Sequence, residues 1–223
     1  MLSIDCLLFL CGCRTMMSQW RTLRNRIDQL NEELGRTHHP LPSQEMCELL
    51  IAGEDHRFWK HCGVDWRALC RAFLKTIFLG RRQGGSTIAM QLVRTITGRY
   101  EPTPLRKLIE ITLAIRLTCY LGRSRLPALY LWVAYYGWRM NNFRQACAQL
   151  SLNPASMSAL DAAMFVARLK YPQPQVRDTV RRTKIYRRGL HLIKLCRGGQ
   201  SKSTLHELCR EWNHLKSQPR LGS

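Results

Sequence analysis

The chain is poor in acidic residues. Only 15 of its 223 residues are Asp or Glu, against 35 Lys or Arg, so the formal net charge at pH 7 is +20. A charge of this size predicts an anionic partner: a nucleic acid, an anionic membrane surface or a phosphate-bearing substrate. The hydrophobic fraction of 45% is still enough to bury a core, which argues against a disordered chain.

Long apolar runs are also absent. The apolar stretch that includes Leu7 to Leu10 is much shorter than the ~20 residues that cross a bilayer. It also lacks the preceding basic residue of a signal peptide. The ten cysteines contain no C-x-x-C pair, which argues against a zinc site. Most of them stand among apolar residues, so we expect mainly buried thiols.

No segment alternates apolar and polar residues with a period of two, so no sheet is expected. Apolar residues recur at helical spacing instead, which predicts an all-α, mainly helical fold. Ser43 and Asp65 are placed to cap two helices, and Ser86 to open a third. The expected helices cover about residues 17–35, 43–54, 65–79, 86–96, 105–121, 127–136 and 159–169.

The sequence divides into three parts. Residues 1–42 form an N-terminal segment with a rudimentary apolar start and a polar helix, and residues 43–174 form the helical domain. Residues 175–223 form a basic C-terminal tail. The stretch 171–223 holds 12 Lys or Arg and three acids, so it can bind nucleic acid or acidic lipid without specificity.

Adjacent carboxylates stand at Glu54 and Asp55, where the second expected helix ends beside Gly53. Phe58 and Trp59 follow closely. A carboxylate in partly apolar surroundings suits proton transfer near neutral pH, so Glu54 is a candidate general base. A pair of solvated surface charges is the alternative.

A glycine-rich run, GGST, occupies residues 84–87. Its glycines let the backbone approach a ligand, and the first N–H groups of a helix opened by Ser86 favour a phosphate or pyrophosphate. Thr87, Gln91 and Arg94 stand at i, i+4 and i+7, so they share a helix face and Arg94 can reach the same anion. An ordinary glycine loop with a serine cap is the alternative.

Arg106, Lys107 and Glu110 fall within one helical turn. Arg106 and Glu110 alone can form a surface ion pair worth only ~0.3–0.5 kcal/mol. The functional interpretation is a pair of cations that stabilises a leaving diphosphate, with the acid orienting them or holding a metal.

The three motifs together, in this order, are more specific than any one of them. The pattern E-D-x-x-F-x-x-H-x-G-x-D is matched in full within residues 54–65, G-G-S-T-I follows at 84–88, and R-K-x-x-E at 106–110. Over residues 43–173 the sequence resembles the peptidoglycan glycosyltransferase family, found as monofunctional enzymes and as the first domain of bifunctional penicillin-binding proteins. The first-motif residues are Glu54, Asp55, Phe58, His61, Gly63 and Asp65.

This resemblance implies a lysozyme-like fold with two lobes around a central cleft, the smaller lobe facing the membrane. It implies polymerisation of lipid II, with inversion at the anomeric carbon and release of a lipid diphosphate. Glu54 is then the general base on the acceptor hydroxyl, and Glu110 the second acid of the cleft. The residues implied to bind the diphosphate are Ser86, Thr87, Gln91, Arg94, Arg106 and Lys107.

The same resemblance implies partners and a location. Lipid II and the growing glycan chain are the expected substrates, and a membrane surface and other cell-wall synthesis proteins are further partners. The implied location is the outer, periplasmic face of the bacterial cytoplasmic membrane. A divalent cation, Mg²⁺ or Mn²⁺, is expected at the substrate diphosphate, where it would neutralise developing charge, and no residue is assigned as a metal ligand.

The helix expected over 65–79 suits the membrane role. Arg67, Arg71 and Lys75 recur every four residues and form one basic stripe, which can meet anionic lipid headgroups. An equally good interpretation is a core helix with one solvated basic face.

Some positions depart from the family pattern. Met90 replaces the first glutamine of a usual pair, Arg94 stands where lysine is usual, and Pro102 replaces a basic residue. The fourth motif is eroded and reads Tyr130-Leu131-Trp132 at its start. The sequence also has no S-x-x-K, so it lacks the serine motif of a transpeptidase and a monofunctional protein is expected.

Three alternatives stay open. A weak or inactive relative that acts as a cell-wall or membrane scaffold is favoured by the eroded fourth motif. A lysozyme-like wall-cleaving enzyme could use Glu54 but has no use for motifs that bind a diphosphate. A nonspecific nucleic-acid-binding protein fits the charge, but no specific nucleic acid is expected because no helix-turn-helix, zinc finger or aromatic RNA-binding motif is visible.

Overall fold

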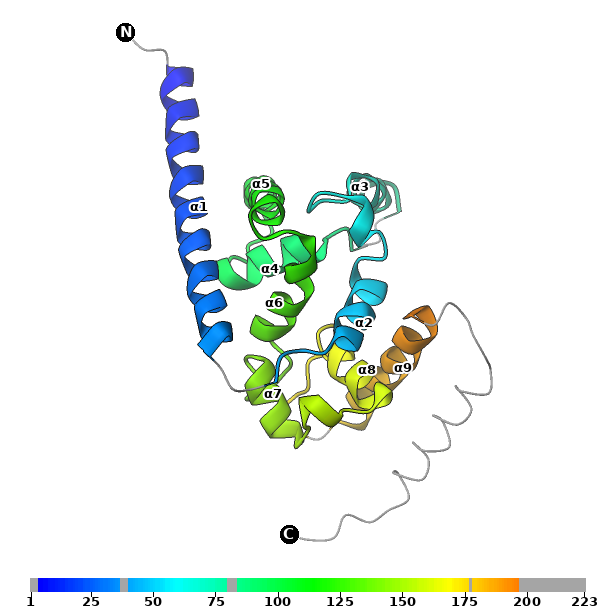
Figure 1. The fold of residues 1–223 in the computed structure, drawn as a ribbon. Helices are drawn as coiled ribbons and strands as arrows, with labels where there is room; N and C mark the ends of the chain where they lie inside the picture. The colour runs from blue at the N-terminus through cyan, green and yellow to red at the C-terminus, as the bar shows by residue number, and fades with distance from the viewer. Residues whose placement is uncertain (1–3, 37–39, 80–83, 177, 197–223) are drawn as a thin grey trace.

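The computed structural model describes residues 4–36, 40–79, 84–176 and 178–196, and these ranges contain helices and no strand (Figure 1). Gly137 makes isolated bridges with Met140 and Gln173. The prediction of an all-α fold is confirmed. The α-helices are α1 (Ile4–Arg36), α2 (Gln44–Glu54), α3 (Trp66–Leu79), α4 (Ile88–Thr97), α5 (Pro104–Leu121), α6 (Leu126–Val133), α7 (Phe143–Leu150), α8 (Ala159–Ala167) and α9 (Thr179–Cys196).

Two predicted helix caps are confirmed. The Ser43 hydroxyl accepts a hydrogen bond from the backbone N–H of Met46 at 3.3 Å and begins α2. The Asp65 carboxylate accepts from the N–H groups of Arg67 and Ala68 at 3.0 and 3.2 Å, at the start of α3. Each cap satisfies N–H groups that have no partner within the helix, so these starts are fixed locally.

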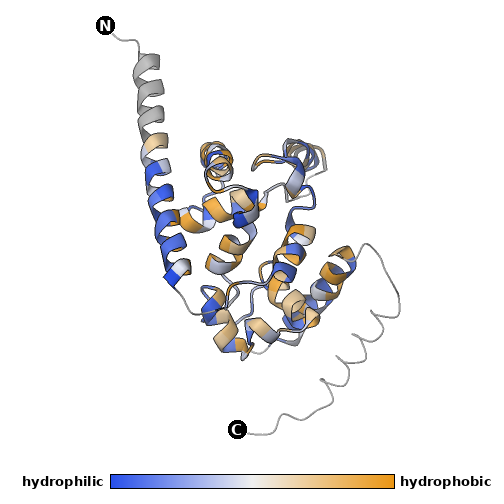
Figure 2. Cartoon of the chain, viewed as in Figure 1, coloured by the Kyte–Doolittle hydropathy of each residue, from blue (hydrophilic) through white to orange (hydrophobic). Residues whose placement is uncertain are grey.

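The core lies between α2, α4, α6 and α8. Helix α4 packs against α5 and α6, and α2 packs against α6, α8 and α9. Figure 2 shows hydrophobic residues along α6 and mainly hydrophilic residues along the coloured, C-terminal part of α1. The fully buried side chains at the centre include Leu50 of α2, Leu92 of α4, Leu131 of α6 and Phe165 of α8.

Helix α1 is longer than predicted. It begins at Ile4 rather than near residue 17, and it runs for 33 residues to Arg36. Leu23, Ile27 and Leu30 are buried where its C-terminal half packs on α4 and α5. Its N-terminal half extends past the rest of the fold (Figure 1). None of the described helices combines the length and the apolar composition that crossing a bilayer requires.

Helix α9 lies in the segment that was predicted as a basic tail. It packs against α8 and α2, and Ile185, Leu192 and Ile193 are buried in this contact. Gly189 also lies against α8, since a Cβ there would come 3.3 Å from the backbone nitrogen of Met164. The packed fold therefore extends past residue 174 to the end of α9.

Helix α3 carries an exposed apolar face. Trp66, Phe73, Leu74 and Phe78 are between 51% and 76% exposed, so this helix is not a core element with one solvated face. Arg67 and Arg71 of the predicted basic stripe are exposed as well. Large apolar side chains exposed together on one helix are typical of interaction sites.

The cysteines are less buried than predicted. Cys47 and Cys147 are buried, and burial raises the pKa of each thiol to about 11. The other described thiols are exposed, so the expectation of mainly buried cysteines is wrong for this part of the chain. Apolar neighbours in the sequence do not decide which face of a helix a cysteine occupies. The exposed cysteines are Cys62, Cys70, Cys119 and Cys196.

Candidate active site

Asp55 is the buried anchor of the first motif. Its side chain lies 2.9 Å from Nε2 of His61 and accepts a hydrogen bond from the N–H of Ile88 at 3.2 Å. Burial raises the pKa of Asp55, while the contact with His61 opposes that shift. Because Ile88 is the first residue of α4, the Asp55 carboxylate joins the end of α2 to the start of α4.

Gly63 and Thr87 form a second link between the motifs. The Thr87 hydroxyl donates to the carbonyl oxygen of Gly63 at 2.6 Å and accepts from the N–H of Met90 at 3.3 Å. Gly63 has a φ of +95°, and a Cβ there would lie 2.5 Å from Oγ1 of Thr118 and 2.6 Å from the carbonyl oxygen of Ala114. Only glycine fits this position without strain.

Asp65 and Phe58 also have structural partners. Burial alone raises the pKa of Asp65, but the N–H of Ala68 and the guanidinium of Arg57, at 3.3 Å, help to hold it below its ordinary value. Phe58 is 2% exposed, and its ring packs edge-on against His61. The first motif thus builds the turn that follows α2.

The loop before α4 differs from the prediction. Thr87 caps the helix, and Ser86 instead accepts a hydrogen bond from Nζ of Lys107 at 3.0 Å. A Cβ at Gly85 would lie 3.1 Å from the carbonyl oxygen of Ala68, so this glycine allows the loop to approach α3. The hydroxyl of Thr87 is buried and bonded in both directions, so it serves the fold, whereas Ser86 faces the cation of the third motif.

Glu54 is the last residue of α2, and its side chain is 24% exposed. One carboxylate oxygen accepts from Nε2 of Gln91 at 3.4 Å, and the other lies 3.1 Å from Nη2 of Arg188. The Tyr130 hydroxyl donates to Oε1 of Gln91 at 2.7 Å. Because the amide oxygen of Gln91 accepts from Tyr130, its amide nitrogen is free to donate to Glu54. The Glu54 carboxylate, when ionised, can only accept. These surroundings are polar, unlike the partly apolar setting that was expected.

Glu110 is buried between two cations. It is 3% exposed, Nη1 of Arg106 donates to one carboxylate oxygen, and Nζ of Lys107 lies 2.8 Å from the other. Burial lowers the pKa of Lys107, Glu110 opposes this, and Arg94 and Arg106 lower it further. An exposed ion pair contributes little to stability. Breaking a buried ion pair is costly, because one charge is then left buried without a partner, so burial keeps the two side chains together. The alternative of a plain surface ion pair is wrong.

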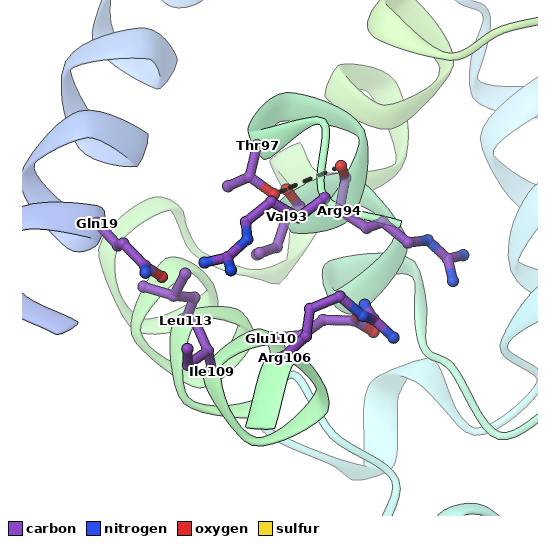
Figure 3. Close-up of a pocket in the computed structure, with 9 residues that line it drawn as sticks. Gln19, Val93, Arg94, Thr97, Arg106, Ile109, Glu110 and Leu113 are labelled. Atoms are coloured by element: carbon purple, nitrogen blue, oxygen red, sulfur yellow. Dashed lines mark hydrogen bonds and ion pairs between the residues drawn. The ribbon is translucent and has the colours of Figure 1, made fainter. Parts of the chain in front are cut away.

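Arg94 reaches the same region from α4. Arg94, Arg106 and Glu110 line one pocket together with residues of α1 and α5 (Figure 3). The guanidinium groups of Arg94 and Arg106 extend toward the same side of that view. The guanidinium carbon of Arg94 also lies 6.0 Å from the centroid of the Tyr100 ring.

Helix α4 therefore connects the two acids. Gln91 contacts Glu54, and Arg94, about one turn further on, lines the pocket with Glu110. Ser86, just before the helix, bonds to Lys107. One helix thus links a partly exposed carboxylate to a group of cations that can hold an anion.

The described residues do not fit a metal ion held by the protein alone. Both carboxylate oxygens of Glu110 are engaged by Arg106 and Lys107, and those of Glu54 by Gln91 and Arg188. Within the described part of the chain, no group of three or more His, Cys, Asp or Glu could hold a metal ion.

Sequence reasoning missed two residues that touch the Glu54 network, Arg188 and Tyr130. Arg188 belongs to the segment that was predicted as a basic tail. Ile185, Leu192 and Ile193 of this segment have the spacing of an amphipathic helix. Tyr130 stood in the eroded fourth motif and was not assigned a role. The apolar spacing could have placed α9 in the fold, but no sequence signal indicated its contact with Glu54.

These features define a class of protein. A helical domain that links a partly exposed carboxylate to a cluster of cations can pair a proton acceptor with a binding site for an anionic group, as a transferase with an anionic substrate requires. Residues 24–194 match the family model described as Transglycosylase, so the chain belongs to the transglycosylase family. The match begins within the C-terminal half of α1 and ends two residues before the end of α9.

Curated relatives agree with this assignment. A biosynthetic peptidoglycan transglycosylase of Laribacter hongkongensis is 30% identical over 162 residues, which is 69% of this chain and 70% of that protein. One of the same description from Chromobacterium violaceum is 31% identical over 76% of this chain and 79% of its own length. Penicillin-binding protein 1A of Escherichia coli is 37% identical over 52% of this chain, which covers only 15% of that longer protein.

Proposed function

We propose that this chain is a peptidoglycan glycosyltransferase that polymerises lipid II into glycan strands. One observation carries the proposal: Gln91 of α4 contacts the partly exposed carboxylate of Glu54, and Arg94 of the same helix lines a pocket with Arg106 and Glu110. A base and an anion-binding group are the two parts that transfer from a sugar diphosphate needs. Membership of the transglycosylase family supports the same reaction.

In this mechanism Glu54 takes the proton of the acceptor's 4-hydroxyl as that oxygen attacks the anomeric carbon of the donor. The new carbon–oxygen bond forms as the bond to the diphosphate breaks on the opposite face, so the anomeric centre inverts. The lipid diphosphate leaves with the electron pair of the broken bond. Arg106, Lys107 and Arg94 stabilise its negative charge, and the Ser86 hydroxyl adds a polar contact.

Glu110 organises the cations in this mechanism. Three cations near one another repel, and the buried carboxylate of Glu110 offsets that repulsion while fixing Arg106 and Lys107. A divalent cation that arrives with the diphosphate stays a prediction, since the described residues do not form a site for it. The cations of the protein supply the charge stabilisation in this proposal.

The domain would work at a membrane surface. Helices α3 and α5 lie at the same end of the fold, and the N-terminal half of α1 extends past them on that side (Figure 1). Apolar side chains are exposed on both helices, among them Phe73 and Phe78 of α3 and Leu105 and Leu108 of α5. With the basic residues of α3, these can enter the headgroup region of anionic lipid, where the lipid part of the substrate lies.

The description of the relatives as peptidoglycan transglycosylases supports a location at the cell envelope. We propose the outer, periplasmic face of the bacterial cytoplasmic membrane as the location, where the growing glycan chain as donor would meet the incoming lipid II as acceptor. Other cell-wall synthesis proteins stay predicted partners.

The test of this function is polymerisation of labelled lipid II by the purified chain in detergent, with and without Mg²⁺, followed by electrophoresis of the products. The expected result is a ladder of glycan strands that a muramidase digests. Two parallel assays address the alternatives: release of fragments from finished wall, and salt-dependent binding of DNA. A folded protein that forms no polymer across several detergents would overturn the enzyme proposal in favour of a scaffold.

A further inference from the structure

Helix α9 brings a guanidinium to the candidate base. Nη2 of Arg188 lies 3.1 Å from Oε1 of Glu54 and 2.8 Å from the carbonyl oxygen of Gly53. The two partners stand 134 residues apart in the sequence. The Arg188 side chain is only 12% exposed, so this contact is enclosed rather than a mobile surface pair.

The close approach of α9 depends on Gly53. A Cβ at residue 53 would lie 2.2 Å from Cδ2 of Leu192 and 3.0 Å from Nη2 of Arg188. Leu192 is buried and follows Arg188 by about one helical turn, so the same face of α9 both packs on α2 and presents the guanidinium. The absence of a side chain at residue 53 leaves room for this contact.

Electrostatics also favours a cation such as Arg188 at the C-terminal end of α2. The Gly53 carbonyl lies in the last turn of α2, where the helix dipole leaves partial negative charge, and Glu54 adds a full negative charge. No basic residue of α2 itself stands in that turn. Arg188 supplies from another helix the cation that this helix end favours.

We propose that Arg188 is a positioning residue that fixes the carboxylate of Glu54 for proton transfer. The inference rests on the proposed function, with Glu54 as the base. Gln91 holds one carboxylate oxygen and Arg188 the other, so the two contacts together restrict rotation of the carboxylate. A base held in one orientation meets the acceptor hydroxyl without a search among rotamers.

The test compares Arg188→Met and Arg188→Lys with the wild type in steady-state lipid II polymerisation. Methionine keeps an apolar stem of similar length, and lysine keeps the charge without the planar fork. Arg187→Met is the matched control, because Arg187 is the adjacent arginine on α9 and is exposed. Thermal unfolding and helicity are measured for each variant.

We expect Arg188→Met to lower kcat by about 10- to 100-fold with little change in KM, since orientation of the base is lost and binding of the donor is kept. Arg188→Lys should recover part of kcat, and Arg187→Met should match the wild type. If Arg188→Met does not fold, a lower kcat in folded Arg188→Lys, with unchanged unfolding temperature, supports the proposal.

Other outcomes would overturn the positioning role of Arg188. Wild-type kcat in folded Arg188→Met, or in Arg188→Lys where the methionine variant does not fold, would reject the positioning role and leave the proposed function intact. A rise in KM at constant kcat would assign Arg188 to substrate binding instead. A wild type that forms no polymer, or an active Glu54→Gln variant, would reject the function or the base first and this inference with it.

Discussion

The hydroxyl of Thr87 donates a hydrogen bond to the carbonyl oxygen of Gly63 across 2.6 Å, and this contact joins two motifs 24 residues apart. Beside it, Asp55 accepts from the N–H of Ile88. Both bonds are buried and lie where α2, α4 and the turn after α2 meet. The first two motifs are therefore one structural unit, which sets the position of Glu54 relative to α4.

Removing this bond should destabilise the protein. Thr87→Val keeps the shape of the side chain but leaves the Gly63 carbonyl and the Met90 N–H without their partner, which should cost about 1–3 kcal/mol. Chemical denaturation of the two proteins measures this difference. Thr87→Ser retains the hydroxyl and serves as the control. Equal unfolding free energies for Thr87→Val and the wild type would contradict the structural role.

Tyr130 should act on the reaction through Gln91. Burial raises the pKa of Tyr130, so its hydroxyl keeps its proton and donates to Gln91 throughout the neutral range. Tyr130→Phe removes that donation and frees the Gln91 amide to rotate away from Glu54, so kcat should fall by about tenfold or less. Steady-state polymerisation checks this, with Tyr135→Phe, an exposed tyrosine nearby in sequence, as the control. An unchanged kcat would remove Tyr130 from the network.

Lys107 should set an alkaline limit on activity. Burial lowers its pKa, with Arg94 and Arg106 adding to the shift and Glu110 opposing it. The ammonium therefore loses its proton at a lower pH than a free lysine does, and diphosphate stabilisation should weaken on the alkaline side of the pH–rate profile. Arginine stays charged in this range, so Lys107→Arg should move the alkaline limb to higher pH. An alkaline limb at the same pH in both proteins would show that another group causes it.

The exposed face of α3 should bind membranes. Phe73→Ser combined with Phe78→Ser removes two large apolar side chains from this face and should weaken binding to anionic lipid vesicles by about tenfold or more. Co-sedimentation with vesicles of phosphatidylglycerol and phosphatidylethanolamine measures the effect. Tyr135→Ser removes an exposed aromatic residue outside α3 and α5 and is the control. An equal loss of vesicle binding in the double variant and in Tyr135→Ser, or no loss in either, would show that the membrane contact lies elsewhere.

Local sequence signals were enough to predict much of this fold. Ser43 and Asp65 cap their helices as expected, because a cap depends on a side chain and the N–H groups two or three residues away. The third motif was predicted within one helical turn, and its ion pairs form there. At α4 two adjacent hydroxyl residues could each have been the cap. Thr87 caps the helix, whereas Ser86 accepts a hydrogen bond from Lys107.

Contacts between distant segments could not be predicted in this way. Glu54 and Arg188 meet only because α9 packs on α2, and the many basic residues of α9 obscured its apolar side. The exposure of Phe73 and Phe78 likewise depends on where α3 sits in the fold, since apolar spacing alone also describes a buried helix. Helix α1 begins at Ile4, although the apolar spacing of its first residues did not predict a helix.

The most direct test of the whole account compares Glu54→Gln with Glu48→Gln in polymerisation of labelled lipid II. Both glutamates belong to α2, but Glu48 is exposed and accepts a hydrogen bond from Nε2 of Gln44 at 3.1 Å. We predict that Glu54→Gln loses at least about a hundredfold in kcat, as expected for removal of a general base, while Glu48→Gln keeps wild-type activity. Polymer formation by folded Glu54→Gln at the wild-type rate would show that Glu54 is not the general base.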